Sequence, residues 1–268
     1  MDTLEMTLSE SLVDEIVAAV GLPTTKFNHN IFRLFFQKII NQLAYLGVTF
    51  DQIAKDEGLP AASEWALTNF CNSVKIHGLE NIPERGPLLV AANHPGAYDG
   101  LVLYSQLVGH TIRSVSSEIP FLDLLPNARQ FFLFASKKDQ RERMLAMRNA
   151  VRHLREGGAV IYFGSGHRDP DPTVYPKAIE SIDNWLDAFD SFFKYVKELQ
   201  VLPVIMAGMV SPKWAKHPIT WLRKNQIDKQ RLAEFGQVIT QLQRPGRLML
   251  APEISIGPTF GENDLRQV

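Results

Sequence analysis

His94 and Asp99, which are separated by four residues, form the pattern in this sequence that best suits acid–base chemistry. They follow the apolar run 88–92, which is typical of a buried strand, and the Asn-His-Pro-Gly segment 93–96 predicts a turn at its end. A carboxylate bonded to one imidazole nitrogen fixes the tautomer and leaves the other nitrogen free to act as a base. The alternative is that His94 is an ordinary loop residue and that Asp99 caps the helix that follows.

Strands and helices alternate through the part of the chain that carries these residues. Apolar runs predict buried strands over 88–92, 131–138, 159–163 and 201–210. Further strands are predicted over 74–77 and 248–254. Helical spacing of apolar residues predicts helices over 144–154, 177–199 and 226–243. This alternation predicts an α/β fold with a mixed central sheet flanked by helices.

The first 72 residues are expected to form a small helical unit that precedes the α/β domain of residues 73–268. Helices are expected over 1–20, 30–47, 50–57 and 61–72, and Gly47 is expected to end the second of them. The segment 30–47 has a wide apolar face, with Arg33 and Lys38 on the opposite face. Packing in a core is the more common outcome for such a helix, and binding at a lipid surface is the alternative.

Composition excludes several classes of protein. The 268 residues are 45% hydrophobic and 21% charged, as is usual for a globular protein, and the net charge of -1 gives no electrostatic argument for nucleic acid. The single cysteine, Cys71, allows no internal disulfide and no cysteine-cluster metal site, which suits a reducing compartment. No apolar run approaches the roughly 20 residues that span a bilayer, and no signal peptide is visible. We therefore expect a cytoplasmic protein, in solution or peripheral on the inner face of a membrane.

The segment around His94 resembles the first motif of the glycerolipid acyltransferase family, which includes glycerol-3-phosphate and lysophosphatidic acid acyltransferases. That motif is a His, four residues and an Asp, usually with Asn before the His, and Asn93, His94 and Asp99 match it. Where the family often has Ser, two places after the His, this chain has Gly96. The resemblance extends over roughly 74–255. It implies that Asp99 orients His94, that His94 removes a proton from an acceptor hydroxyl, and that the hydroxyl oxygen attacks an acyl thioester directly.

The segment after the strand 159–163 resembles the third motif of the family, Phe-Pro-Glu-Gly-Thr-Arg. Phe163, Gly166 and Arg168 match it, whereas Ser165 stands in place of the Glu. The resemblance implies that this segment binds the acceptor and that Arg168 holds its phosphate. From the residues alone, 164–166 is also compatible with a plain glycine turn. It fits a hydrolase nucleophile elbow less well, because the two outer glycines of that pattern are missing.

Lys137 stands at the end of a predicted strand, where the family places a phosphate-binding Arg. The resemblance implies that Lys137 assists Arg168, although an ammonium lacks the bidentate geometry of a guanidinium. The basic residues from Lys137 to Arg143 are equally compatible with a solvated helix face.

The resemblance implies an O-acyltransferase of the phospholipid biosynthesis type. The donor would be acyl-CoA or an acyl carrier protein thioester, the acceptor a glycerol-phosphate or a lysophospholipid, and no metal or cofactor is expected. Two other hypotheses remain: a thioester or lipid hydrolase in which His94 activates water, and a non-catalytic lipid-binding relative. Because Ser165 replaces the family's Glu, we expect an acceptor other than plain glycerol-3-phosphate.

Overall fold

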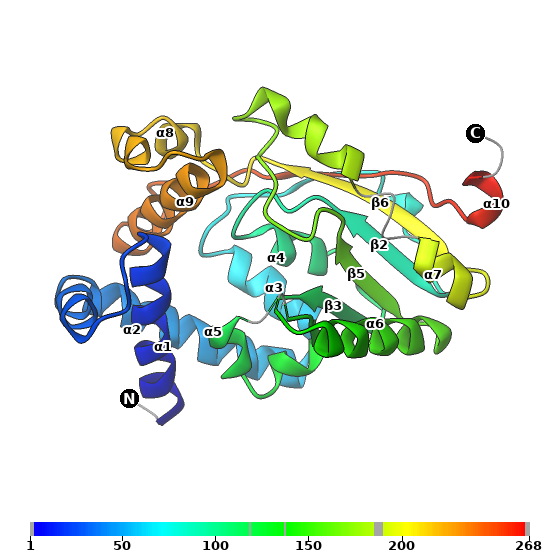
Figure 1. Cartoon of the computed structure of the whole chain (residues 1–268), viewed down its shortest axis with the longest axis horizontal. Helices are drawn as coiled ribbons and strands as arrows, with labels where there is room; N and C mark the ends of the chain where they lie inside the picture. The colour runs from blue at the N-terminus through cyan, green and yellow to red at the C-terminus, as the bar shows by residue number, and fades with distance from the viewer. Residues whose placement is uncertain (1–2, 118, 137, 185–189, 266–268) are drawn as a thin grey trace.

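The computed structural model describes residues 3–117, 119–136, 138–184 and 190–265. Within these residues a seven-stranded sheet forms the centre of the molecule, with helices on both of its faces (Figure 1). The strands are β1 (Lys75–His77), β2 (Leu88–Ala92), β3 (Ile112–Ser116), β4 (Phe132–Phe134), β5 (Ala159–Phe163), β6 (Gln200–Ala207) and β7 (Glu253–Ile256). The predicted fold class is confirmed, because the sheet is mixed and a helical region precedes it.

The order of the strands is β1-β7-β6-β2-β5-β3-β4. β2 lies at the centre and pairs in parallel with both β5 and β6, and β3 continues the parallel part between β5 and β4. The mixed character arises at one side, where β7 pairs antiparallel with β6 and parallel with β1. The carboxyl ends of β2 and β5 therefore meet at the same edge of the sheet.

The two faces of the sheet are covered by different helices. The helices are α1 (Thr3–Ala19), α2 (Lys26–Asp56), α3 (Leu59–Leu67), α4 (Asp99–Tyr104), α5 (Pro120–Asp123), α6 (Gln140–Arg155), α7 (Asp190–Tyr195), α8 (Pro212–Ala215), α9 (Gln226–Gln243) and α10 (Glu262–Leu265). Leu88, Val90 and Ala92 of β2 pack in one core cluster with residues of α1 to α4. Leu89 and Ala91 point to the other face, which α6 and α7 cover. This alternation is the period-two pattern of a strand that is buried on both sides.

The N-terminal helices share the main core cluster with the sheet. Leu12, Ile40 and Leu59 belong to the same cluster of buried residues as Val90. The predicted boundary at residue 72 falls where helices give way to strands, and the division into a helical unit and an α/β domain stays a prediction.

The prediction that Gly47 ends a helix was wrong, because α2 continues through it from Lys26 to Asp56. A Cβ atom on Gly47 would lie 2.6 Å from the ring of Phe121. The glycine is therefore required for close packing against α5 rather than for a turn. The predicted helices 30–47 and 50–57 are one element.

The single predicted helix over 177–199 was wrong for the part that the structure describes, and its residues 185–189 lie outside the described residues. Residues Pro176–Asn184 form a 3-10 helix, called η3, and α7 ends at Tyr195. The last predicted strand, 248–254, lies later in the chain, as β7 over Glu253–Ile256. The predicted helix over 226–243 is confirmed as α9.

Candidate active site

The candidate site lies where two neighbouring parallel strands end. Ala92, the last residue of β2, is paired with Phe163, the last residue of β5. The loop that carries His94 and the loop that carries Arg168 therefore leave the sheet side by side. Loops at the carboxyl ends of strands are the usual place for chemistry in α/β proteins.

His94 and Asp99 form a hydrogen-bonded pair in which His94 Nδ1 lies 2.7 Å from Asp99 Oδ2. Asp99 is the first residue of α4, so the turn from β2 into this helix brings the two side chains together. The same carboxylate accepts hydrogen bonds from the backbone N–H groups of Gly96 at 3.0 Å and Gly100 at 2.6 Å, which fix its orientation. Because Nδ1 is engaged, Nε2 is the imidazole nitrogen left for proton transfer.

Burial and Asp99 act on the pKa of His94 in opposite directions. The side chain of Asp99 is 3% exposed and that of His94 is 30% exposed, and the His94 ring packs against Phe163 at a centroid distance of 4.7 Å. Burial has the largest effect and lowers the pKa of His94, whereas the charge and the hydrogen bond of Asp99 raise it. The pKa of His94 ends above its ordinary value. The pair therefore has the geometry expected of a base with its orienting carboxylate, and the role of His94 as the base stays a prediction.

Gly96, where the family often has Ser, is explained by close packing. A Cβ atom on Gly96 would lie 2.6 Å from Cβ of Met209. This loop therefore has no room for a serine side chain.

Asp169 joins the loop after β5 to the loop that carries His94. Its Oδ2 accepts hydrogen bonds from the backbone N–H of His94 at 2.8 Å and from the Ser165 hydroxyl at 3.1 Å, and its own N–H donates to the carbonyl of His94 at 2.8 Å. The Ser165 hydroxyl also lies 2.7 Å from the carbonyl of His167, so both of these hydrogen bonds stay within this loop. Ser165 stands where the family has a Glu, so Asp169 supplies the carboxylate of this segment.

Arg168, the residue expected to hold a phosphate, is paired with a carboxylate from α9. Its Nη1 contacts Oε2 of Glu234, whose side chain is 4% exposed, whereas that of Arg168 is 23% exposed. Burial raises the pKa of Glu234, and the charge of Arg168 opposes this rise. The charges of Arg168 and Glu234 both affect the pKa of His94, so the pair lies within electrostatic range of the proposed base.

A buried polar row on α9 supports the loops of the site. Its members are spaced three or four residues apart and are Gln230, Glu234, Gln237 and Gln241. Gln230 Nε2 donates to the carbonyls of Pro95 at 2.7 Å and Asp169 at 3.1 Å, which links the two loops. One face of α9 therefore positions both loops of the candidate site.

Asn93 connects the start of the His94 loop to β6. Its side-chain Nδ2 donates to the carbonyl of Met206 at 2.8 Å, and the N–H of Met206 donates to Asn93 Oδ1 at 2.7 Å. Asp171 fixes the end of β6 similarly, because its carboxylate accepts from the N–H groups of Gly208 at 3.0 Å and Val210 at 2.8 Å. The side chains of Asn93 and Asp171 therefore bind backbone groups at the end of β6, where β2 and β6 are no longer paired.

Of the predicted acceptor-binding residues, Ser165, Gly166 and Arg168 lie together in the loop after β5, and Lys137 lies outside the described residues. Gly166 has a φ of +64°, a left-handed conformation that favours glycine, so the expected glycine turn is present. The acceptor-binding role of these residues stays a prediction.

Sequence reasoning missed Asp169, Glu234 and Gln230. The spacing of the four polar residues on α9 was the available signal, since positions 230, 234, 237 and 241 share one helical face. Which carboxylate meets Arg168 depends on tertiary packing between segments 66 residues apart.

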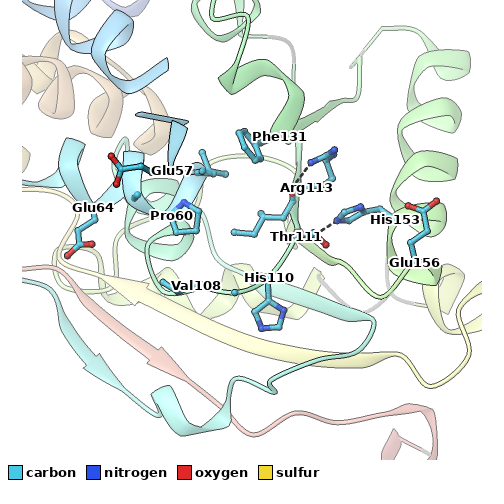
Figure 2. Close-up of a pocket in the computed structure, with 15 residues that line it drawn as sticks. Glu57, Pro60, Glu64, Val108, His110, Thr111, Arg113, Phe131, His153 and Glu156 are labelled. Carbon is cyan, nitrogen blue, oxygen red and sulfur yellow. Dashed lines mark hydrogen bonds between the residues drawn. The ribbon is translucent and has the colours of Figure 1, made fainter. Parts of the chain in front are cut away.

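A cavity of about 750 Å³ lies at the edge of the sheet where β3 begins, and its lining residues are drawn in Figure 2. It is lined by the start of β3, the beginning of α3 and the end of α6, with His110, Arg113 and His153 among its residues. Because β2, β3 and β5 run parallel, this edge is where strands begin, whereas His94 follows the end of β2. We therefore place the candidate active site at His94.

Within the described ranges, no three His, Cys, Asp or Glu side chains gather as a metal-binding group. No helix of the same residues combines the length and the apolar character needed to cross a bilayer.

Comparison with known proteins gives a family match and a distant structural similarity. No curated protein matches the chain. Among solved structures, the chain is similar to the 1-acyl-sn-glycerophosphate (LPA) acyltransferase PlsC from Thermotoga maritima, with 18% identity and a TM-score of 0.46, over 98% of this chain and 90% of that one. A family model described as Acyltransferase matches residues 73–207, the stretch that includes β1 to β6 and both loops of the candidate site. The chain therefore belongs to the Acyltransferase family.

Proposed function

We propose that this chain transfers a fatty acyl group from an acyl-CoA or acyl carrier protein thioester to a hydroxyl of a glycerol-phosphate or lysophospholipid acceptor. The observation that supports this most is the bond of 2.7 Å between His94 Nδ1 and the buried carboxylate of Asp99. The family supports acyl transfer in general, and the proposal adds the donor, the acceptor and the base.

In the proposed mechanism His94 Nε2 takes the proton of the acceptor hydroxyl as its oxygen attacks the thioester carbonyl. An oxygen–acyl bond forms, and a tetrahedral intermediate results. When the intermediate collapses, the carbon–sulfur bond breaks and the thiolate leaves, and the His94 imidazolium returns the proton to the sulfur. Asp99 stabilises the imidazolium and holds the tautomer, so neither residue is consumed.

The loop after β5 is the proposed acceptor-binding segment. It adjoins His94 through Asp169, and Arg168 is its cationic side chain. A headgroup bound beside Arg168 would lie within electrostatic range of His94, as the effect of Arg168 on the pKa of His94 indicates. Lys137 remains a second candidate for binding the phosphate of this headgroup, and this proposal rests on the sequence alone.

Incubation of the purified protein with labelled acyl-CoA, with and without a lysolipid acceptor, tests this function. We expect an acylated lipid that forms only when acceptor is present, and a loss of about 10²–10⁴-fold in rate for His94→Ala with the protein still folded. Release of free fatty acid without acceptor would indicate a hydrolase instead. The absence of any turnover in the wild type would favour a non-catalytic lipid-binding protein.

We also propose that the outer face of α2 contacts a membrane surface, as suits a lipid-acylating enzyme. Phe27, Leu34 and Phe35 are 72%, 78% and 75% exposed, whereas Ile39 and Ile40 of the same helix are buried. Large exposed apolar patches usually mark interaction surfaces.

A second exposed apolar pair is a further candidate for membrane contact. Trp221 and Leu222 are 77% and 78% exposed, and the neighbouring Arg223 lies against Gly21 in the connection between α1 and α2. The proposed location is peripheral, on the inner face of the membrane.

A further inference from the structure

The cation expected to hold an acceptor phosphate is already bound by a carboxylate of the same chain. Arg168 contacts Oε2 of Glu234, and the contact lies beside the loop that carries His94. The side chain of Arg168 is 23% exposed, so a ligand can still reach part of it. The acceptor segment therefore presents an ion pair and not a free positive charge.

Glu234 depends on Arg168 for compensation of its buried charge. Its second oxygen, Oε1, is buried and has no hydrogen-bond partner within the part of the chain that the structure describes. Removing the partner of a buried carboxylate is strongly destabilising, because it leaves an uncompensated charge in the interior. Arg168 therefore cannot leave Glu234 and give its full charge to a ligand without a large cost.

Other carboxylates nearby disfavour a highly charged anion. Asp99 and Asp169 are both buried and both bond to His94, the first through the ring and the second through the backbone N–H. A phosphate monoester carries about 1.5 to 2 negative charges near pH 7, and a phosphodiester carries one. Because Coulomb repulsion is proportional to charge, the monoester is repelled more strongly by these groups than the diester is.

We propose that Glu234 determines the acceptor class: by holding Arg168 it excludes acceptors with a phosphate monoester and admits lysophospholipids whose phosphate is a diester. Arg168 stays paired with Glu234 and interacts with the single charge of the diester. This inference rests on the proposed function and narrows its acceptor. The acyl transfer step itself is unchanged.

The test compares two acceptors with the same acyl chain, lysophosphatidate and lysophosphatidylethanolamine, using labelled palmitoyl-CoA as donor. For the wild type, we expect kcat/KM for lysophosphatidylethanolamine to exceed that for lysophosphatidate by about tenfold or more, because one unit of charge near a ligand produces effects of at least this size. Glu234→Gln keeps the shape of the side chain and removes its charge, so Arg168 becomes available to the monoester. The ratio of the two kcat/KM values should then move towards lysophosphatidate by about tenfold, mainly through its KM.

Asp228→Asn is the matched control, because it removes one negative charge from the exposed side of the same helix. It should leave the ratio of the two acceptors unchanged, and a change as large as that of Glu234→Gln would overturn the inference. The ratio does not depend on how much of a preparation is folded, and the wild-type comparison is decisive even if Glu234→Gln is unstable.

A wild type that prefers lysophosphatidate, or a Glu234→Gln variant with the wild-type ratio, overturns the inference and leaves acyl transfer standing. If neither these lysolipids nor glycerol-3-phosphate yields an acylated product, the proposed function fails and the inference fails with it.

Discussion

Replacing Asp99 with asparagine should disable the proposed base while retaining the shape of the loop. The carboxylate of Asp99 receives three N–H groups, from His94 and Gly96 on Oδ2 and from Gly100 on Oδ1. An amide has one oxygen and one NH2 group, so it cannot accept on both sides. If its NH2 group faces His94, the imidazole proton is forced onto Nε2 and the base is lost. If its oxygen faces His94, the tautomer survives but the negative charge does not.

Either orientation of the amide should cost about 10²–10⁴-fold in turnover, the usual contribution of general-base catalysis. At 1.36 kcal/mol per tenfold change, this corresponds to about 3 to 5 kcal/mol of transition-state stabilisation. The unmatched N–H group should also lower the free energy of unfolding by about 1–3 kcal/mol, which a denaturant titration would measure.

The pH profile provides a second and independent test. The base must be neutral to accept a proton, so activity should rise as the pH passes upward through the raised pKa of His94. The Asp99→Asn variant lacks the charge and the hydrogen bond that raise this pKa, while burial and the charge of Arg168 still lower it. Its acid limb should therefore move to lower pH.

Initial rates with labelled acyl-CoA at saturating acceptor, measured from about pH 5 to 9, would give both quantities. Asp56→Asn is a suitable control, since Asp56 is exposed at the end of α2 and bonds only to Gln52 among the hydrogen bonds of the described residues. Near-normal turnover of Asp99→Asn, or an acid limb that stays in place or moves to higher pH, would refute the role assigned to Asp99.

Two further predictions concern packing and the membrane. Gly96→Ala places a Cβ atom 2.6 Å from Met209 Cβ, so it should lower the free energy of unfolding by about 1–3 kcal/mol and reduce turnover; stability equal to the wild type in a denaturant titration would contradict the close contact. Leu34→Ser combined with Phe35→Ser removes exposed apolar area and should reduce sedimentation with anionic vesicles without a loss of thermal stability. Unchanged sedimentation would reject α2 as the contact surface, and Met144→Ser, at an exposed position on α6, is the control.

The paired His94 and Asp99 could be predicted from the sequence because their geometry is local. Four residues separate them, and a turn into a helix is enough to bring them together. The pairing of Arg168 with Glu234 could not be predicted in this way. It depends on how α9 packs on the loops, and many acidic residues are equally compatible with Arg168 by sequence.

The sheet was predicted more accurately than the helices. Strands buried on both faces, such as β2 and β5, appear as short apolar runs, and both have the predicted bounds. Gly47 was misinterpreted because a glycine in a helical pattern can either end the helix or make room for a neighbouring side chain. Only the position of Phe121 distinguishes these two explanations. The segment 177–199 has helical spacing of apolar residues, yet that spacing does not distinguish a 3-10 turn from an α-helix over short stretches.

The side chain of Asn93 acts as a substitute peptide group, since its one donor and one acceptor match the C=O and N–H of Met206. The backbone of β2 can therefore turn away from the sheet at Asn93, one residue before the proposed base, while the N–H and C=O of Met206 on β6 keep hydrogen-bond partners. This arrangement couples His94 mechanically to β6, a strand that lies on the opposite side of β2 from the Arg168 loop. A displacement of β6 would reach the base through this carboxamide as well as through the backbone pairing of β2 with β6.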